Sequence, residues 1–128
     1  MPETILLKKL HSGAKKFVAI FPDGKKVRFG AAGASDYTHH HDPERMARYV
    51  KRHGGRATKE TEPRRIHADM LTVTRSKKED WSPKTGLFKA GFFSRWVLWS
   101  QPSISKAVSQ TNKILKQIGK YKIKIALT

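Results

Sequence analysis

An aromatic segment, LFKAGFFSRWVLW at residues 87–99, limits the fold of this chain more than any other feature. In a helix, residues three and four positions apart share a face. One face would therefore carry Phe88, Phe92, Trp96 and Trp99, with Phe93 and Val97 beside them. Burial of these rings requires a small domain to pack around them, so we expect the segment to form the core. Base stacking, a protein groove and a membrane interface are the alternatives for such a face.

Arg95 lies in the middle of this aromatic segment. A guanidinium among aromatic rings can stack on one of them, or it can project toward an anionic partner. The sequence leaves both roles open, and we include Arg95 among the candidate partner-binding cations.

Composition limits both the size of the core and the kind of partner. A chain of 128 residues with 38% hydrophobic content can close one compact domain. Lysine and arginine number 27 against 10 acidic residues, and the resulting charge of +17 favours anionic partners. The absence of cysteine excludes disulfides, thiolate zinc sites and cysteine nucleophiles, and it fits a reducing compartment. The apolar run at residues 5–7 is too short for a signal peptide or a membrane span, so we expect a soluble or peripheral protein.

Alternating apolar and basic residues predict a β-hairpin near the N-terminus. Residues 16–21 and 25–29 form the two strands, and Pro22-Asp23-Gly24 provides the turn. Because strand side chains alternate between faces, Val27 and Phe29 should face the core, whereas Lys26 and Arg28 should face solvent.

Two helices and a strand are predicted farther along the chain. Asp42 and Pro43 are typical of a helix start, and this basic helix should end at His53, before two glycines. A longer amphipathic helix should begin at Pro102 and end at Gly119. Its apolar stripe consists of Ile104, Val108, Thr111, Leu115 and Ile118. Residues 121–127 alternate like a final strand, which would present Lys120, Lys122 and Lys124 on its open side.

The remaining segments lack a sustained period. Residues 56–80 are expected to form a long loop or arm with one short strand at 70–73, and residues 1–15 an extended N-terminal segment. Residues 1–128 thus form one basic α+β domain. It contains a β-hairpin, a short basic helix, an aromatic helix, a longer amphipathic helix and a C-terminal strand.

The stretch GAAGASDYTHHHDPER at residues 30–45 resembles a metal or phosphate site at first sight. Adjacent histidines point in divergent directions, so one ion cannot easily use all three. The lysine of a nucleotide-binding loop is missing after Gly33, and a turn is the simpler role for the glycines. Asp36 and Asp42 suit turn and helix-cap positions. We therefore predict no catalytic, metal or cofactor site. A nuclease using His41 and Asp42 is the least favoured function.

Several motifs resemble a family of small, uncharacterised basic proteins encoded by large double-stranded DNA viruses of algae and amoebae. They are FPDGKKVRFGAAGASDYTHHHDPERMARYVKRHGG at residues 21–55, the tryptophan at 81, and GLFKAGFFSRWVLWSQPSISKAV at residues 86–108. The likeness covers about half of the chain, and the extended segment 56–80 departs from the family. The family has no established activity or catalytic residues. The resemblance implies a viral setting, in which small minor capsid proteins tie a large icosahedral shell together.

The expected function is therefore that of a virion structural protein, a minor capsid protein that is made in the host cytoplasm or nucleus. Its partners would be other capsid proteins, with viral DNA or the inner membrane as further electrostatic contacts and no small-molecule substrate. A nucleic-acid-binding protein for genome packaging or transcription is the alternative. The candidate anion-binding residues are Lys26, Arg28, Arg45, Arg48, Arg52, Arg56, Arg64, Arg65, Arg95, Lys122 and Lys124.

Overall fold

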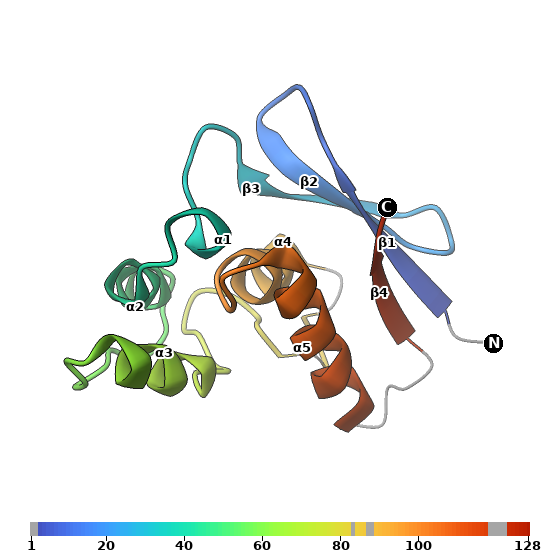
Figure 1. Ribbon diagram of the computed structural model, residues 1–128. Helices are drawn as coiled ribbons and strands as arrows, with labels where there is room; N and C mark the ends of the chain where they lie inside the picture. The colour runs from blue at the N-terminus through green and yellow to red at the C-terminus, as the bar shows by residue number, and fades with distance from the viewer. Residues whose placement is uncertain (1–2, 83, 87–88, 118–122) are drawn as a thin grey trace.

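A four-stranded mixed sheet packed against helices forms the domain (Figure 1). The computed structural model describes residues 3–82, 84–86, 89–117 and 123–128. The strands are β1 (Glu3–Lys9), β2 (Lys15–Ile20), β3 (Lys26–Ala31) and β4 (Ile123–Leu127). The helices are α1 (Tyr37–His40), α2 (Pro43–Arg52), α3 (Pro63–Leu71), α4 (Ala90–Phe93), the π-helix η1 (Ser94–Leu98) and α5 (Ile104–Gln117). The predicted small α+β domain is confirmed. Within these ranges, no helix is long and apolar enough to cross a membrane.

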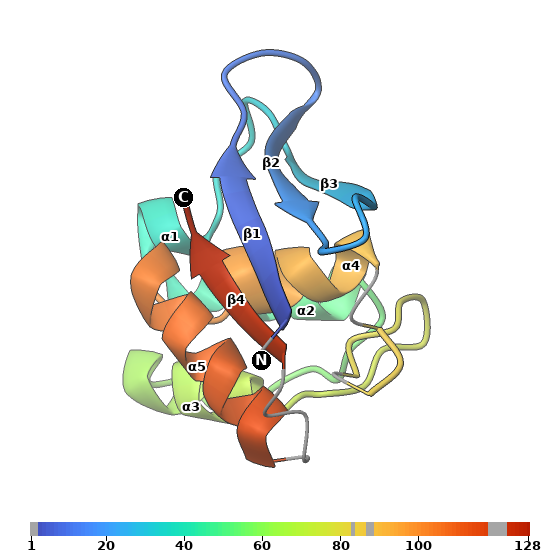
Figure 2. The same ribbon diagram turned by 90° about the vertical axis from the view of Figure 1, so that its right-hand side faces the viewer.

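The sheet has the strand order β3-β2-β1-β4 and joins the two ends of the described chain. β1 pairs antiparallel with β2, which pairs antiparallel with β3, whereas β4 runs parallel to β1 (Figure 2). The hairpin and the final strand are confirmed, although Lys120 and Lys122 lie outside the described residues. The N-terminal segment is more ordered than expected, because β1 is an inner strand that buries Ile5 and Leu7.

One face of the sheet packs on α4, η1 and α5. We call this cluster the sheet core; its buried members are Ile5, Leu7, Phe17, Ala19, Phe21, Phe29, Phe92, Phe93, Trp96, Val97, Leu98, Val108, Leu115 and Ile125. Phe29 lies at its centre, with its ring centroid 5.7 Å from that of Phe17 and 5.4 Å from that of Phe93. The prediction that the aromatic helix forms the core is confirmed for the described residues, which do not include Phe88.

The long helix α5 lies beside the edge strand β4 (Figure 2). Val108, Thr111 and Leu115 of the predicted stripe are buried, while the predicted end at residues 118–119 lies outside the described residues. The Asn112 amide donates to the carbonyl oxygen of Ile125 at 3.0 Å and accepts from its N–H at 2.9 Å. This pairing satisfies backbone groups that an edge strand would otherwise expose to another chain.

The basic helix α2 begins as predicted. Asp42 is its N-cap, with its carboxylate accepting from the backbone N–H of Glu44 at 3.0 Å, and Pro43 occupies the first turn. Met46, Tyr49 and Val50 form the buried side of the helix.

Residues 56–80 do not form the predicted arm. They contain α3, which packs against α2, so the strand predicted at residues 70–73 is wrong. Pro63 suits the first turn of this helix, and the four-residue spacing of Ile66 and Met70 places both on its buried side. The sequence analysis missed this helix because only Ile66 and Met70 mark its buried side, and charged residues lie between and around them.

The helices α1, α2 and α3 enclose a second cluster away from the sheet (Figure 1). We call it the helical core; its buried members are Tyr37, Met46, Tyr49, Val50, Ile66, Met70, Val73 and Trp81. Trp99 packs against both cores and stacks on Tyr49 at 4.3 Å between ring centroids. The two clusters are therefore in contact and belong to one domain.

Candidate functional site: cationic surfaces and a lysine-lined cavity

The outer side of the sheet carries three of the predicted cations. Lys26 and Arg28 of β3 and Lys124 of β4 are exposed, and the strand register places them on the side opposite the sheet core. Arg28 lies opposite Val18, which in turn lies opposite Lys8 of β1. We call the side formed by Lys8, Lys26, Arg28 and Lys124 the open sheet face.

The helix α2 presents three more of the predicted cations. Arg45, Arg48 and Arg52 are exposed and follow one side of the helix, away from its buried residues. No carboxylate of the described chain lies within 4.0 Å of these three guanidinium groups. They are therefore free to meet an external anion.

The helix α3 carries Arg64 and Arg65 in its first turn. Positive side chains at this end oppose the helix dipole, typically by about 0.3–1 kcal/mol each. The N-cap Glu62 makes no side-chain cap hydrogen bond, and its carboxylate lies 3.6 Å from the Nε of Arg65. Helix stability thus gives no reason for this pair of arginines. We call Arg45, Arg48 and Arg52 of α2, which have no such carboxylate beside them, the arginine surface.

Arg56 already has an anionic partner within the chain. Its guanidinium donates to the two carboxylate oxygens of Asp69 at 2.9 and 3.0 Å, and to the hydroxyl of Thr72 at 2.9 Å. Hydrogen bonds from Arg56 lower the pKa of Asp69, and the same contact raises the pKa of Arg56. This forked pair joins the start of the 56–80 segment to the end of α3.

Arg95 is not on the surface, so its assignment as a partner-binding residue is wrong. It is fully buried, with the guanidinium carbon 4.5 Å from the ring centroid of Trp96 and 5.4 Å from that of Trp81. Its N–H groups donate to the carbonyl oxygens of Trp99 at 3.1 Å, of Val73 at 3.3 Å, and of Met70. Burial lowers the pKa of Arg95 to about 10, so it stays charged at neutral pH. The stacking role left open by the sequence is the one observed.

Acidic residues are unevenly distributed along the chain. Seven of the ten lie between residues 42 and 80, a segment that also contains eleven lysines and arginines. From residue 81 onward there are nine lysines and arginines and no acidic residue. Exposed lysines of α5 in this part are Lys106, Lys113 and Lys116. Most of the excess positive charge therefore belongs to the part of the chain outside residues 42–80, which includes the sheet and α5.

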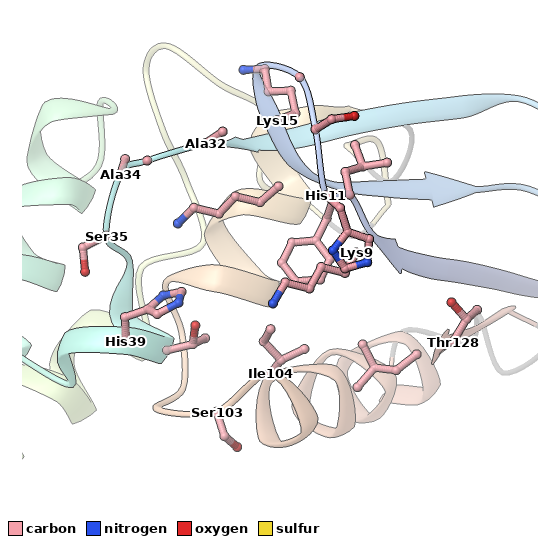
Figure 3. A pocket seen from close by; sticks show the side chains of 18 of the residues that line it. Lys9, His11, Lys15, Ala32, Ala34, Ser35, His39, Ser103, Ile104 and Thr128 are labelled. Atoms are coloured by element: carbon pink, nitrogen blue, oxygen red, sulfur yellow. The ribbon is translucent and has the colours of Figure 1, made fainter.

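A cavity of about 960 Å³ opens where the β1–β2 turn, residues 32–39 and the start of α5 meet (Figure 3). Lys9, Lys15 and Lys16 line it together with His11 and His39, and none of the lining side chains that the structure describes is acidic. We call it the lysine-lined cavity. Sequence reasoning missed it, although paired lysines on each side of the β1–β2 turn were a visible signal.

Asp36 lies buried behind the wall of this cavity. Its carboxylate accepts from Lys16 Nζ at 2.8 Å and from the Thr38 backbone N–H at 2.9 Å, and it lies 3.2 Å from His39 Nδ1. Burial raises the pKa of Asp36, but the hydrogen bonds from Lys16 and Thr38 outweigh it and leave the pKa below 3.8. Asp36 is therefore ionised at neutral pH and holds Lys16 and His39 in place.

A groove of about 430 Å³ between α5 and β4 adjoins the cavity, because Ser105 and Leu127 line both. Lys113, Lys116 and Lys124 line this groove, and no acidic side chain is among its described lining residues. Leu127 of β4 also lines the groove and is 44% exposed. Positive charge thus continues from the cavity along α5.

The histidine-rich stretch has structural roles. His40 packs on Trp99 at 5.2 Å between ring centroids, and its Nδ1 accepts from the Asp42 N–H at 2.9 Å. Asp36 and Asp42 are N-caps of α1 and α2, as predicted. Among the described residues, no group of three or more histidine, aspartate or glutamate side chains is arranged to hold a metal ion. Gly33, with a φ of 82°, lies in the turn after β3 as predicted, whereas Gly30, with a φ of 78°, lies within β3.

Comparison with known proteins gives one family match. A model described as a family of unknown function (DUF5754) matches residues 5–53, which span most of β1 through the end of α2 and cover two of the motifs discussed above, the hairpin and the basic helix. No curated protein and no solved structure matches the chain. The first part of this chain is similar to a family whose function is itself unknown.

Proposed function

We propose that the protein is a non-enzymatic structural component that docks onto anionic surfaces of a larger assembly. We further propose that this assembly is the shell of a large DNA virus, in which the protein serves as a minor capsid protein with other capsid proteins as its partners. The observation that carries the proposal is the presence of two separate cationic surfaces, the open sheet face and the arginine surface.

These surfaces lie on different sides of the molecule. The open sheet face points away from α4, η1 and α5, whereas α2 and α3 lie beyond those helices (Figure 1). A protein that bridges two neighbours needs a contact on each of two sides. A protein that reads DNA sequence instead concentrates its contacts on one element that enters a groove. The distribution of free cations supports bridging.

Individual exposed ion pairs contribute little, typically about 0–1 kcal/mol. Docking through these surfaces therefore needs several cations acting together, and it should weaken as salt screens them. The cations project from a strand and a helix, so docking does not require a flexible segment of backbone to become ordered.

The test compares two charge reversals of equal size with a matched control. R45E/R48E/R52E alters the arginine surface, K8E/K26E/R28E alters the open sheet face, and K59E/R75E/K77E alters exposed cations outside both surfaces. Circular dichroism should show that all three variants fold. Incorporation into particles of the virus that carries the gene should fall for the first two variants and stay normal for the control.

Release with shell fragments when particles are partly dissociated would support the capsid location. Normal incorporation of both folded surface variants would overturn the proposal.

Nucleic acid is the second candidate partner, favoured by Arg64 and Arg65, whose placement helix stability does not explain. In that case log affinity for duplex DNA should fall with log salt at a slope near −0.9 per contacted phosphate, with little dependence on sequence. Release of the protein with DNA from dissociated particles would favour this candidate over the shell.

A further inference from the structure

We infer that the lysine-lined cavity binds an acidic peptide segment of a partner protein, one that also carries aliphatic side chains. The inference rests on the proposed function, because it names the chemistry of a docking partner. The evidence for it is the cavity itself, which the sequence analysis did not predict.

Charge is the first argument for an acidic ligand. Lys9 and Lys15 are exposed, and no carboxylate of the described chain lies within 4.0 Å of either ammonium group. Lys16 is bound to Asp36, which is 2% exposed and therefore behind the cavity wall. Figure 3 shows His39 on one side of the cavity and Lys9 and His11 on the other. An entering carboxylate would meet the ammonium groups of Lys9 and Lys15 and the imidazoles of His11 and His39, and none of the described lining side chains is acidic.

Apolar surface is the second argument, because it restricts which kind of acidic ligand fits the cavity. Ile104 of α5 and the exposed Leu127 of β4 line the cavity together with Leu10. Exposed aliphatic surface next to cations is suited to a ligand that alternates acidic and aliphatic groups. A phosphate backbone would leave this apolar wall without a partner.

The aromatic content of the cavity argues against single-stranded nucleic acid. Proteins that bind single strands usually stack bases on exposed aromatic rings. Phe17 is the only phenylalanine, tyrosine or tryptophan among the lining residues that the structure describes, and it is 6% exposed and packed on Phe29. The cavity therefore offers no open ring face of this kind, and peptide is the favoured ligand.

The mode of binding is side-chain recognition rather than addition of a strand. Along the adjoining groove the backbone of Ile125 is already paired with the amide of Asn112. A peptide lying there would find this part of the β4 edge occupied. Its carboxylates would instead meet Lys113, Lys116 and Lys124.

The experiment measures fluorescence anisotropy of a short labelled peptide in which glutamates flank leucines, with the purified full-length protein. K9E/K15E should weaken binding by about tenfold or more, because it reverses charge at the cavity. The matched control K59E/R75E has the same change in net charge at exposed positions away from the cavity and should weaken binding less than about threefold. Leu127→Ser should weaken binding by about fivefold, with an unchanged melting curve.

Three reference ligands complete the test: the same peptide with serines in place of leucines, a thymidine oligonucleotide of equal charge, and vesicles containing anionic phospholipid. The leucine peptide should bind more tightly than each of them. Equal binding of the serine peptide, tighter binding of the oligonucleotide or the vesicles, or equal losses for K9E/K15E and K59E/R75E would overturn the inference. Such a result would leave the proposed function standing if the surface variants still lost incorporation into particles.

Discussion

The two cores of this small domain are built differently. The sheet core contains only aliphatic and aromatic side chains, which pack between a sheet and the helices that cover it. The helical core has two tyrosines, two methionines and a tryptophan among its members. The buried guanidinium of Arg95 lies between the cores, 4.5 Å from the ring centroid of Trp96 in the sheet core and 5.4 Å from that of Trp81 in the helical core. Burial of apolar surface stabilises both cores. The helical core also depends on polar groups that hold irregular chain in place.

The contact between the cores is where this difference matters most. Trp99 packs against both clusters, and Arg95 of η1 binds the carbonyl oxygens of Met70 and Val73. Trp96, a member of the sheet core, donates its indole N–H to the carbonyl oxygen of Trp81 at 2.9 Å. Side chains of the aromatic helix thus donate hydrogen bonds to backbone carbonyl oxygens of residues in the helical core. Four predictions test how far the two cores depend on each other.

The largest effect is expected for Trp96→Ala. Trp96 is 3% exposed, and truncation of a buried tryptophan typically costs about 3–5 kcal/mol. A domain of this kind is stable by only about 5–15 kcal/mol, so both cores should lose cooperative unfolding in a thermal scan followed by circular dichroism. Leu6→Ala, at an exposed position of β1, is the control and should melt like the parent. A variant of Trp96 that also melts like the parent would mean that the aromatic helix is not central to the fold.

Met70→Ala should separate the two cores. Met70 is fully buried in the helical core, and its truncation typically costs about 2–5 kcal/mol. Amide hydrogen exchange should quicken in α2 and α3, while β1, β2 and β3 stay protected. Arg64→Ala, at an exposed position of the same helix, should leave exchange unchanged. Equal loss of protection in the sheet would show that the two cores unfold as one unit.

Arg95→Lys should have a smaller effect on the contact between the cores. Lysine keeps the charge but cannot reproduce the planar fork that lies on Trp96 and donates to three carbonyl oxygens. Buried acceptors left unpaired typically cost about 1–3 kcal/mol, which should lower the urea midpoint. Arg95→Met should lower it further, because no donor remains. Equal midpoints for the parent and the methionine variant would show that these carbonyls do not need the guanidinium.

The smallest effect concerns pH and His40, which lies between Tyr37 of the helical core and Trp99. Burial, followed by the charge of Arg45, lowers the pKa of His40 below its ordinary value of 6.5, and this outweighs the opposing effects of Asp42 and Asp36. The unfolded chain then binds a proton more readily than the folded chain. Stability should therefore fall as the pH drops below 6.5, until the folded pKa is reached.

Melting curves between pH 7.5 and 5.5 test this expectation. The parent should lose stability over this range by more than His40→Asn does, since asparagine can accept the same backbone N–H without titrating. The loss due to Asp36 would occur only at lower pH, because its pKa lies below 3.8 and its stabilising contacts persist until it is protonated. Parallel curves for the parent and the variant would remove His40 as the cause.

The elements that the sequence predicted are those with their own periodicity and boundary residues. The alternation of β3, the N-cap Asp42 of α2 and the stripe of α5 are local signals, and each was confirmed. β1 was not recognised as an inner strand, because its Ile5-Leu6-Leu7 run has no alternation and its burial depends on β4. The helix α3 was missed because only a pair of apolar residues marks its buried side.

The candidate site could be predicted only in part, for a similar reason. The periodicity of a strand or a helix predicts which charged side chains face solvent, and Lys26 and Arg45 are exposed as predicted. Arg95 was misplaced because its burial depends on carbonyl oxygens contributed by residues far away in sequence. The lysine-lined cavity is assembled from separate stretches of chain around residues 9–17, 32–39, 102–105 and 127–128. Only the fold brings them together.

The parallel pairing of β1 with β4 also determines the order in which the protein can be completed. Glu3 lies opposite Ile123 and Leu7 opposite Leu127, so a strand made first on the ribosome waits for one made more than a hundred residues later. Contacts this distant in sequence slow folding. Until β4 arrives, one edge of β1 is open to a strand from another chain. A nascent or truncated chain that ends before residue 123 should therefore aggregate more readily than one that includes β4, because the edge of β1 stays uncovered.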